Sequence, residues 1–141
     1  MTNKIDTILP LALAAGFAFF GAQKFGAENI VFETLATRSG IELFEPYARY
    51  ATGAAEFAAA ALLALPRSRT LGLVFGLAIL LGAIGLHLSP WLGIVVPGIG
   101  IGLFLTAVAM LAVTGFALAR RIKALRLTPT PRLSNRLAPL G

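Results

Sequence analysis

Residues 70–88, TLGLVFGLAILLGAIGLHL, decide the fold of this chain. They contain no Asp, Glu, Lys or Arg. At about 1.5 Å per helical residue they can cross the roughly 30 Å hydrocarbon core of a bilayer. An uncharged apolar run of this length is typical of a transmembrane helix, so the sequence places this segment in a membrane.

Three further apolar runs flank this segment, and together they predict an all-α integral membrane four-helix bundle. Pro46 opens the second run and Pro66 ends it, as expected of prolines at helix boundaries. The last run is too long for a straight crossing, so either the helix kinks at Pro97 or residues 91–96 lie at the interface. The predicted single membrane domain covers residues 1–126, with spans at about 7–24, 46–65, 70–88 and 91–119.

The first two spans are separated by the longest polar stretch before the tail. Its apolar residues recur at spacings of three and four, as in Val31 and Leu35 or Ile41 and Phe44. This pattern predicts an external amphipathic helix at the interface, broken at Ser39-Gly40. An ordered loop that caps the bundle is the alternative.

The composition excludes soluble enzymes and soluble binding modules. Of the 141 residues, 57% are hydrophobic and 13% are charged, and the mean hydropathy is +0.84. Soluble domains carry about 25% charged residues. The absence of cysteine excludes disulfides, thiolate metal sites and iron–sulfur ligation, and a single histidine excludes bis-histidine haem ligation within one chain. The sequence therefore predicts no metal and no cofactor.

The chain has a net charge of +6, and its cations are distributed as in a multi-pass protein of a bacterial inner membrane. Nine cations (Lys4, Arg67, Arg69 and the six after residue 119) fall on one side of a four-span topology, against Lys24, Arg38 and Arg49 on the other. The positive-inside rule then places both termini in the cytoplasm. We expect anionic lipid rather than nucleic acid as the partner of these cations, and a disordered basic tail over residues 127–141. The residues expected at lipid headgroups are Arg120, Arg121, Lys123 and Arg126.

Small residues recur at intervals of four in the last two spans. Gly72 and Gly76 form a GxxxG step, and Gly98 and Gly102 form another. Such steps allow close backbone approach between membrane helices. The pattern predicts packing within the bundle, with a homo-oligomeric interface or a groove for a partner membrane subunit as the alternatives.

Glu56 is the polar residue that most needs an explanation. It lies about 15 Å along the helix from Pro46, near the bilayer midplane, where an unpaired carboxylate costs several kcal/mol. Lys24 is the first expected partner, Arg49 the second and His87 the third, because the topology places all of them in the external half of the bundle. This candidate cluster predicts either a structural ion pair or a binding pocket. Lys24 could instead extend to the headgroups, and His87 could bind a backbone carbonyl.

The chain resembles the DoxX/DoxX-like family of small four-helix inner-membrane proteins over roughly residues 7–119. The resemblance rests on three motifs: Gly21-Ala22-Gln23-Lys24-Phe25, Gly53-Ala54-Ala55-Glu56 and Pro66-Arg67-Ser68-Arg69. A histidine near the end of the third span fits the same layout. The resemblance implies an association with membrane redox assemblies that are linked to quinones. A thiol role does not carry over, because this chain has no cysteine.

Two functions follow as hypotheses. The first is an accessory or structural subunit of a quinone-linked redox complex or another membrane complex, without catalytic residues of its own. The alternative is a stand-alone membrane enzyme or small carrier. Its externally open pocket, lined by Lys24, Glu56 and His87, would take a quinone or a small lipophilic acid. A closed bundle favours the first hypothesis, and a cavity lined by these three side chains favours the second.

Overall fold

The computed structural model describes residues 4–127, and this part of the chain is all-helical, with no strand. Three of its helices are long and apolar enough to cross a membrane: α1, α4 and α5. The helix α3 carries two charges, Arg49 and Glu56, and is not among the three. The elements are α1 (Lys4–Gln23), α2 (Ile30–Ser39), the 3₁₀ turn η1 (Glu42–Phe44), α3 (Tyr47–Ala64), α4 (Arg69–His87) and α5 (Gly102–Leu127).

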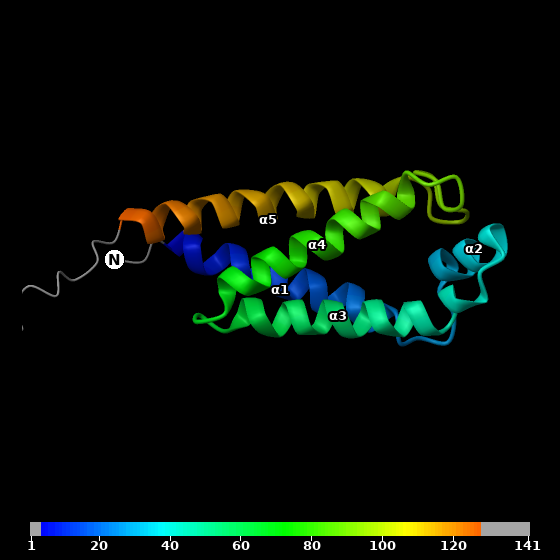
Figure 1. Ribbon diagram of the computed structural model, residues 1–141, viewed down its shortest axis with the longest axis horizontal. Coiled ribbons are helices and arrows are strands. Elements are labelled where there is room, and N and C mark those ends of the chain that lie inside the picture. The colour runs from blue at the N-terminus through cyan, green and yellow to red at the C-terminus, as the bar shows by residue number, and fades with distance from the viewer. Residues whose placement is uncertain (1–3, 128–141) are drawn as a thin grey trace, which may run out of the picture.

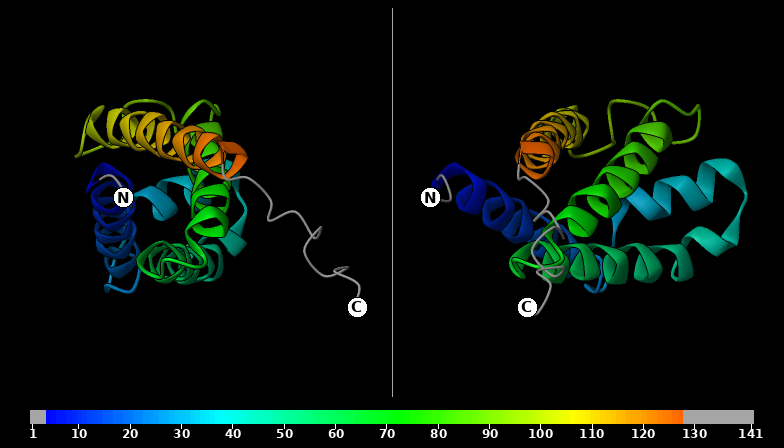
Figure 2. Two further views of the ribbon diagram at one scale, coloured as in Figure 1. Left: turned by 90° about the vertical axis from the view of Figure 1, so that its left-hand side faces the viewer. Right: turned by 60° about the vertical axis from the view of Figure 1, so that its left-hand side comes forward.

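The four long helices form two packed pairs, α1 with α3 and α4 with α5, and α3 also packs against α4 about as extensively as α4 against α5. The connection between α3 and α4 joins the pairs, and α1 and α5 make a smaller contact. Viewed along their length, the four helices lie at the sides of a square (Figure 2). We call the end with α2 and residues 88–101 the α2 end, and the opposite end, where α3 turns into α4, the turn end (Figure 1).

The main hydrophobic core lies toward the turn end and joins the two pairs. Phe17 of α1 and Leu63 of α3 are fully buried against Leu73 of α4. Two predicted packing glycines make this approach possible, because a Cβ atom on Gly72 would lie 2.9 Å from the backbone nitrogen of Leu63, and one on Gly76 would lie 2.9 Å from the Phe17 ring. Gly72 and Gly76 thus lie where α4 approaches α3 and α1 closely.

A second hydrophobic cluster closes the α2 end. The helix α2 exists as predicted: the Asn29 side chain caps its start by accepting a hydrogen bond from the Phe32 N–H, and Gly40 ends it in the left-handed conformation, with φ of 71°. Its buried side chains pack against residues 88–101, so α2 also covers the bundle, as in the alternative interpretation. The cluster consists of Phe32, Leu35, Leu92 and Val96.

The helix in the region of the predicted fourth span has other bounds than residues 91–119. Residues 88–101 form turns, and the helix begins at Gly102 rather than at residue 91 or Pro97, and continues to Leu127 rather than ending at residue 119. Positive φ angles at Gly93, Gly98 and Gly100 (78°, 76° and 80°) fold this segment back on itself and stop a helix from forming. Gly98 is therefore a turn residue and not a packing residue. A Cβ atom on Gly102 would meet nothing within 4 Å, so Gly102 packs no helix here either.

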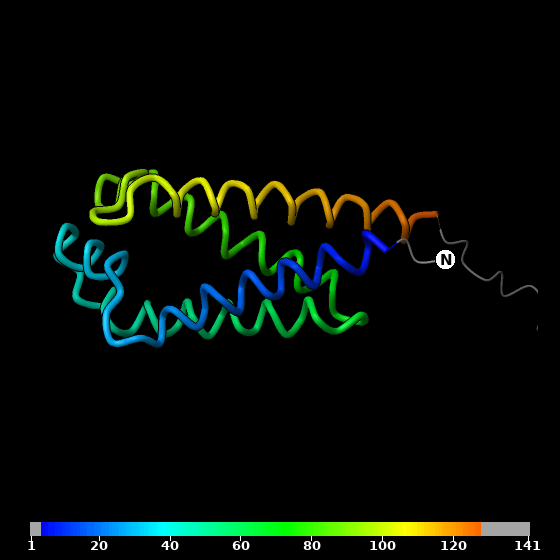
Figure 3. Tube along the Cα trace, turned by 180° about the vertical axis from the view of Figure 1, so that it is seen from behind, coloured from blue at the N-terminus to red at the C-terminus, as the bar shows by residue number. Residues whose placement is uncertain are grey.

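Polar contacts connect the start of α1, the turn between α3 and α4, and the last part of α5 at the turn end. Arg120 Nε lies 2.9 Å from Asp6 Oδ1, and Arg121 donates hydrogen bonds to Thr70 Oγ1 at 2.7 Å and to the Pro66 carbonyl at 3.1 Å. The start of α1 and the end of α5 lie side by side here (Figures 1 and 3). Arg120 and Arg121 thus bind protein groups, and Lys123 and Arg126 are exposed. The expected tail falls outside the described residues, apart from Leu127.

Candidate functional site

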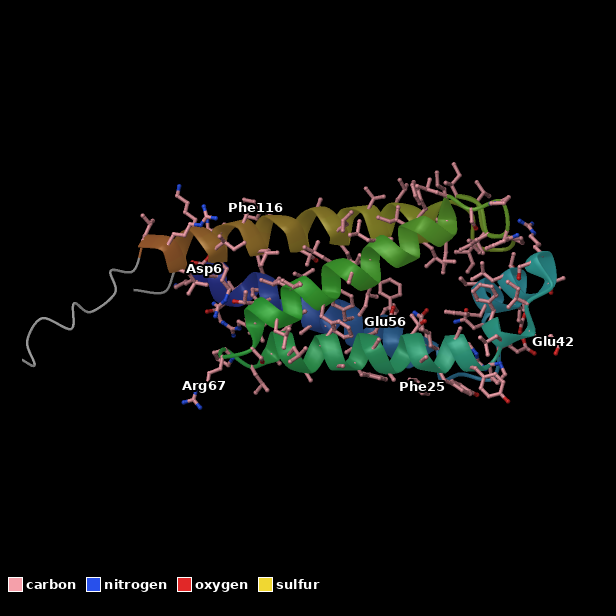
Figure 4. The ribbon with its side chains drawn as sticks, in the orientation of Figure 1. Asp6, Phe25, Glu42, Glu56, Arg67 and Phe116 are labelled. Atoms are coloured by element: carbon pink, nitrogen blue, oxygen red, sulfur yellow. The ribbon has the colours of Figure 1, made fainter. Side chains whose placement is uncertain are left out.

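An ion pair between Lys24, which follows α1 directly, and Glu56 of α3 lies at the centre of the candidate site. Lys24 Nζ is 2.9 Å from Glu56 Oε1 and 2.8 Å from Oε2, and the exposed fractions of the two side chains are 14% and 10%. Glu56 lies on the side of α3 that faces the other helices (Figure 4). The partner that the sequence suggested first is the one that Glu56 has.

Two glycines position this ion pair. A Cβ atom on Gly53 would lie 3.0 Å from Lys24 Cβ, and one on Gly21 would lie 3.3 Å from Glu56 Cβ. Each glycine precedes the charged residue of its own helix by three positions, and residues at this spacing share a helix face. The Gly-x-x-Lys and Gly-x-x-Glu motifs therefore have a physical meaning: the glycine lets the partner helix approach, and the charge one turn later meets its counter-ion.

Arg49 is not a partner of Glu56, which corrects the second expectation. Its guanidinium donates hydrogen bonds to the Lys24 carbonyl at 2.9 Å and the Gly26 carbonyl at 2.7 Å, and it pairs with Glu45 Oε1 at 2.6 Å. These carbonyls follow the end of α1 and have no further turn of helix to bind them. Arg49 is 3% exposed and holds the chain just after α1 in place, which fixes the position of Lys24.

His87 ends α4 and is buried with a backbone carbonyl as its partner, as the simpler interpretation expected. Its Nδ1 lies 2.9 Å from the Gly93 oxygen, and its ring packs edge-on against Phe104 at 5.7 Å between ring centroids. A carbonyl only accepts, so Nδ1 carries a proton, and in the neutral form of the ring with this tautomer Nε2 is an acceptor. Within residues 4–127 no hydrogen bond joins His87 to Glu56 or Lys24.

A cavity of about 660 Å³ lies between the two helix pairs, and Lys24, Glu56 and His87 all line it. Arg49 does not line it. Three further polar residues of the wall, Gln23, Asn29 and Thr106, were not predicted from the sequence. The remaining wall is apolar or small. Among the lining residues are Gln23, Asn29, Thr52, Thr106, Ala78, Ile79, Leu80, Gly82, Ala83, Leu86 and Met110.

The cavity is electrically balanced and offers hydrogen bonds of both kinds. Lys24 supplies N–H donors and its charge is matched by Glu56, whose carboxylate accepts, as does His87 Nε2. The third N–H of Lys24 has only a long contact of 3.4 Å with the Phe20 carbonyl. The described residues contain no group of three or more His, Asp or Glu side chains that could hold a metal ion.

Comparison with known proteins gives no matching family model, no matching curated protein and no matching solved structure.

Proposed function

We propose that this chain is a multi-pass membrane protein that binds a quinone-class lipid in the cavity between its helix pairs. One observation carries the proposal: the cavity has Lys24, Glu56 and His87 on its wall. This was the feature expected to separate a pocket from a closed accessory bundle. Its volume of about 660 Å³ lies within the range of roughly 300–1,000 Å³ that is usual for small-molecule pockets.

The charge balance favours a neutral ligand over a lipophilic acid. A bound carboxylate would need an uncompensated cation, and the charge of Lys24 is matched by both oxygens of Glu56. A quinone carbonyl accepts a hydrogen bond from Lys24, and a quinol hydroxyl donates one to Glu56 or to His87 Nε2. The apolar wall around Ile79 and Leu80 suits the ring and the first part of a tail.

The membrane setting is part of the proposal. In this account α3 crosses with the three longer helices as a fourth span, since Glu56 is paired and both of its charges are buried. The turn end lies in the cytoplasm of a bacterial cell, since it contains Arg67 and Arg69 and the exposed Lys123 and Arg126. A place in the DoxX-like family is supported by the two glycine-plus-charge motifs that build the ion pair.

An accessory role explains how such a chain would use a quinone. A chain without cysteine can hold no iron–sulfur cluster, so a partner subunit that contains a redox centre would exchange electrons with the bound quinone. The lined cavity favours a stand-alone quinone-binding enzyme or carrier over a closed accessory bundle, and a quinone-binding accessory subunit of a membrane redox complex is the second proposal.

A cavity-filling variant tests the proposal. The full chain is reconstituted in nanodiscs and titrated with decylubiquinone, and bound quinone is counted per chain. We expect one saturable site. Ala83→Phe fills the cavity and should weaken binding at least about tenfold, or about 1.4 kcal/mol. Ala112→Phe, an exposed position on α5 outside the cavity lining, is the matched control and should bind as the parent chain does. Equal quinone binding by the parent chain, Ala83→Phe and Ala112→Phe would refute the proposal. The absence of a saturable site in the parent chain would refute it as well.

A further inference from the structure

The cavity is covered at the α2 end, where an externally open pocket would need an opening to water. Phe32 and Leu92 line the cavity there and pack with Leu35 and Val96. The exposed fractions of these four side chains are 4%, 1%, 0% and 0%. Arg38 adds hydrogen bonds from α2 to the Trp91 and Leu92 carbonyls, at 3.5 and 3.4 Å. A ligand from the aqueous phase would have to break this cluster.

The side of the cavity between α3 and α4 is different. These helices touch near their turn, where Gly72 meets the backbone of Leu62 and Leu63. They diverge toward the α2 end (Figures 1 and 2). Gly82 lies farther along α4 and lines the cavity, yet a Cβ atom on it would meet nothing within 4 Å.

Small side chains line both edges of this divergence. Ala51 and Ala55 come from α3, and Ala78 and Gly82 come from α4; all four line the cavity. Ala51, Ala78 and Gly82 are exposed as well. Small residues on facing membrane helices normally bring backbones together. Here they lie where the two helices diverge, so a passage between α3 and α4 would have apolar walls.

We propose that the pocket is loaded sideways from the bilayer, through this passage between α3 and α4, by a lipid whose polar head reaches Lys24 and Glu56 while its tail stays in the passage. The inference deepens the proposed function and rests on it for the identity of the head. It commits to a membrane-resident ligand with a hydrocarbon tail, because Ala51, Ala55, Ala78 and Gly82 offer no polar side chain. On the opposite side, between α1 and α5, the lining includes the larger side chains of Phe20, Gln23 and Met110 beside the smaller Thr106 and Ala107.

Spin-label accessibility tests the passage without any ligand. The chain has no cysteine, so single variants label cleanly. Gly82→Cys and Thr52→Cys probe the passage and the cavity wall, Gly85→Cys is the lipid-facing control on α4, and Glu42→Cys is the exposed control at the α2 end. In nanodiscs we expect labels at 82, 52 and 85 to collide often with oxygen and rarely with a water-soluble nickel chelate. Strong collision with nickel at 82 and 52, as at 42, would overturn the proposal. So would weak collision with both reagents at 82 and 52.

A kinetic measurement separates this proposal from the proposed function. The association rate of decylubiquinone is followed in nanodiscs with Gly82→Phe, with Gly85→Phe as the matched control, and with Gln23→Phe on the opposite side. We expect Gly82→Phe to slow association at least about tenfold and more than Gln23→Phe does, and Gly85→Phe, outside the cavity lining, to leave it unchanged. Slowing by Gln23→Phe alone would contradict the α3–α4 passage and leave the pocket intact. Absence of saturable binding in the parent chain would refute the quinone pocket, while the spin-label result would still decide whether the passage exists.

Discussion

At the scale of single residues, the Lys24–Glu56 pair places two opposite charges where neither could remain alone. The pair is bidentate in the sense that both carboxylate oxygens lie within 2.9 Å of one ammonium nitrogen. Removing one member of a buried ion pair typically costs about 3–5 kcal/mol, because it leaves the other charge uncompensated. Replacing both members by neutral side chains of similar size costs far less.

This asymmetry gives the first prediction. Lys24→Met should lower the free energy of unfolding by about 3–5 kcal/mol, and the double variant Lys24→Met, Glu56→Gln should recover most of the loss. Reversible unfolding of the detergent-solubilised chain measures both. Glu28→Gln, at an exposed position, is the control and should change little. If the double variant were as unstable as Lys24→Met, the ion pair would not be the cause of the loss.

The candidate site was predictable from the sequence to different degrees at different residues. Lys24 and Glu56 could be matched because chain direction alone places the end of α1 and the middle of α3 in the same half of the bundle. Arg49 could not be assigned, because its partners are Glu45 and two backbone carbonyls after α1, and no side-chain pattern marks a carbonyl. Asn29 and Thr106 line the cavity because of the way whole helices pack, and the sequence around them does not predict this position.

At the scale of elements, glycines that look alike in the sequence have opposite roles. Gly72 lies against the backbone of α3, whereas Gly85 lies on an open face of the same helix, where a Cβ atom would meet nothing within 4 Å. The difference depends on which face of α4 meets a neighbour. The sequence identified Gly72 and Gly76 by their spacing, and the same spacing was misleading at Gly98, which belongs to a turn.

A matched pair of alanine variants tests this difference. Gly72→Ala places a Cβ atom 2.9 Å from a backbone nitrogen, which cannot move without shifting α3, so we expect a loss of about 1–3 kcal/mol relative to Gly85→Ala. Both variants gain the same helix propensity, so their difference in free energy of unfolding isolates the packing. Equal stability of the two variants would show that α3 and α4 do not need this close approach.

At the scale of the whole molecule, the arrangement has two hydrophobic clusters with a cavity between them. The apolar runs predicted the positions of α1, α3 and α4 to within a few residues, because length and hydropathy are local properties of the sequence. The late start of α5 and the divergence of the helix pairs were not predictable in this way. They depend on the turns at residues 88–101 and on the contacts of α2 with that segment.

Orientation in the membrane is a prediction at this scale. Reporter fusions after residue 35 and after residue 126 should report opposite compartments, with the second in the cytoplasm. The reason is that nine Lys and Arg residues lie on the side of the termini and three on the other side. Fusions to the full chain with an intact α5 provide the control for insertion. If both fusions reported the cytoplasm, α1 would not cross the membrane and the cavity would not lie within the bilayer.

The infrared spectrum of bound quinone tests the central claim most directly, because it reads the hydrogen bonds that the cavity is proposed to make. Decylubiquinone labelled with ¹³C at its carbonyl groups is measured in nanodiscs with the parent chain and with the Lys24→Met, Glu56→Gln double variant. A carbonyl that accepts a hydrogen bond from Lys24 should absorb at lower frequency than the same quinone in lipid alone, and this shift should disappear in the double variant. A carbonyl frequency equal to that in lipid, or a shift that survives in the double variant, would contradict the account.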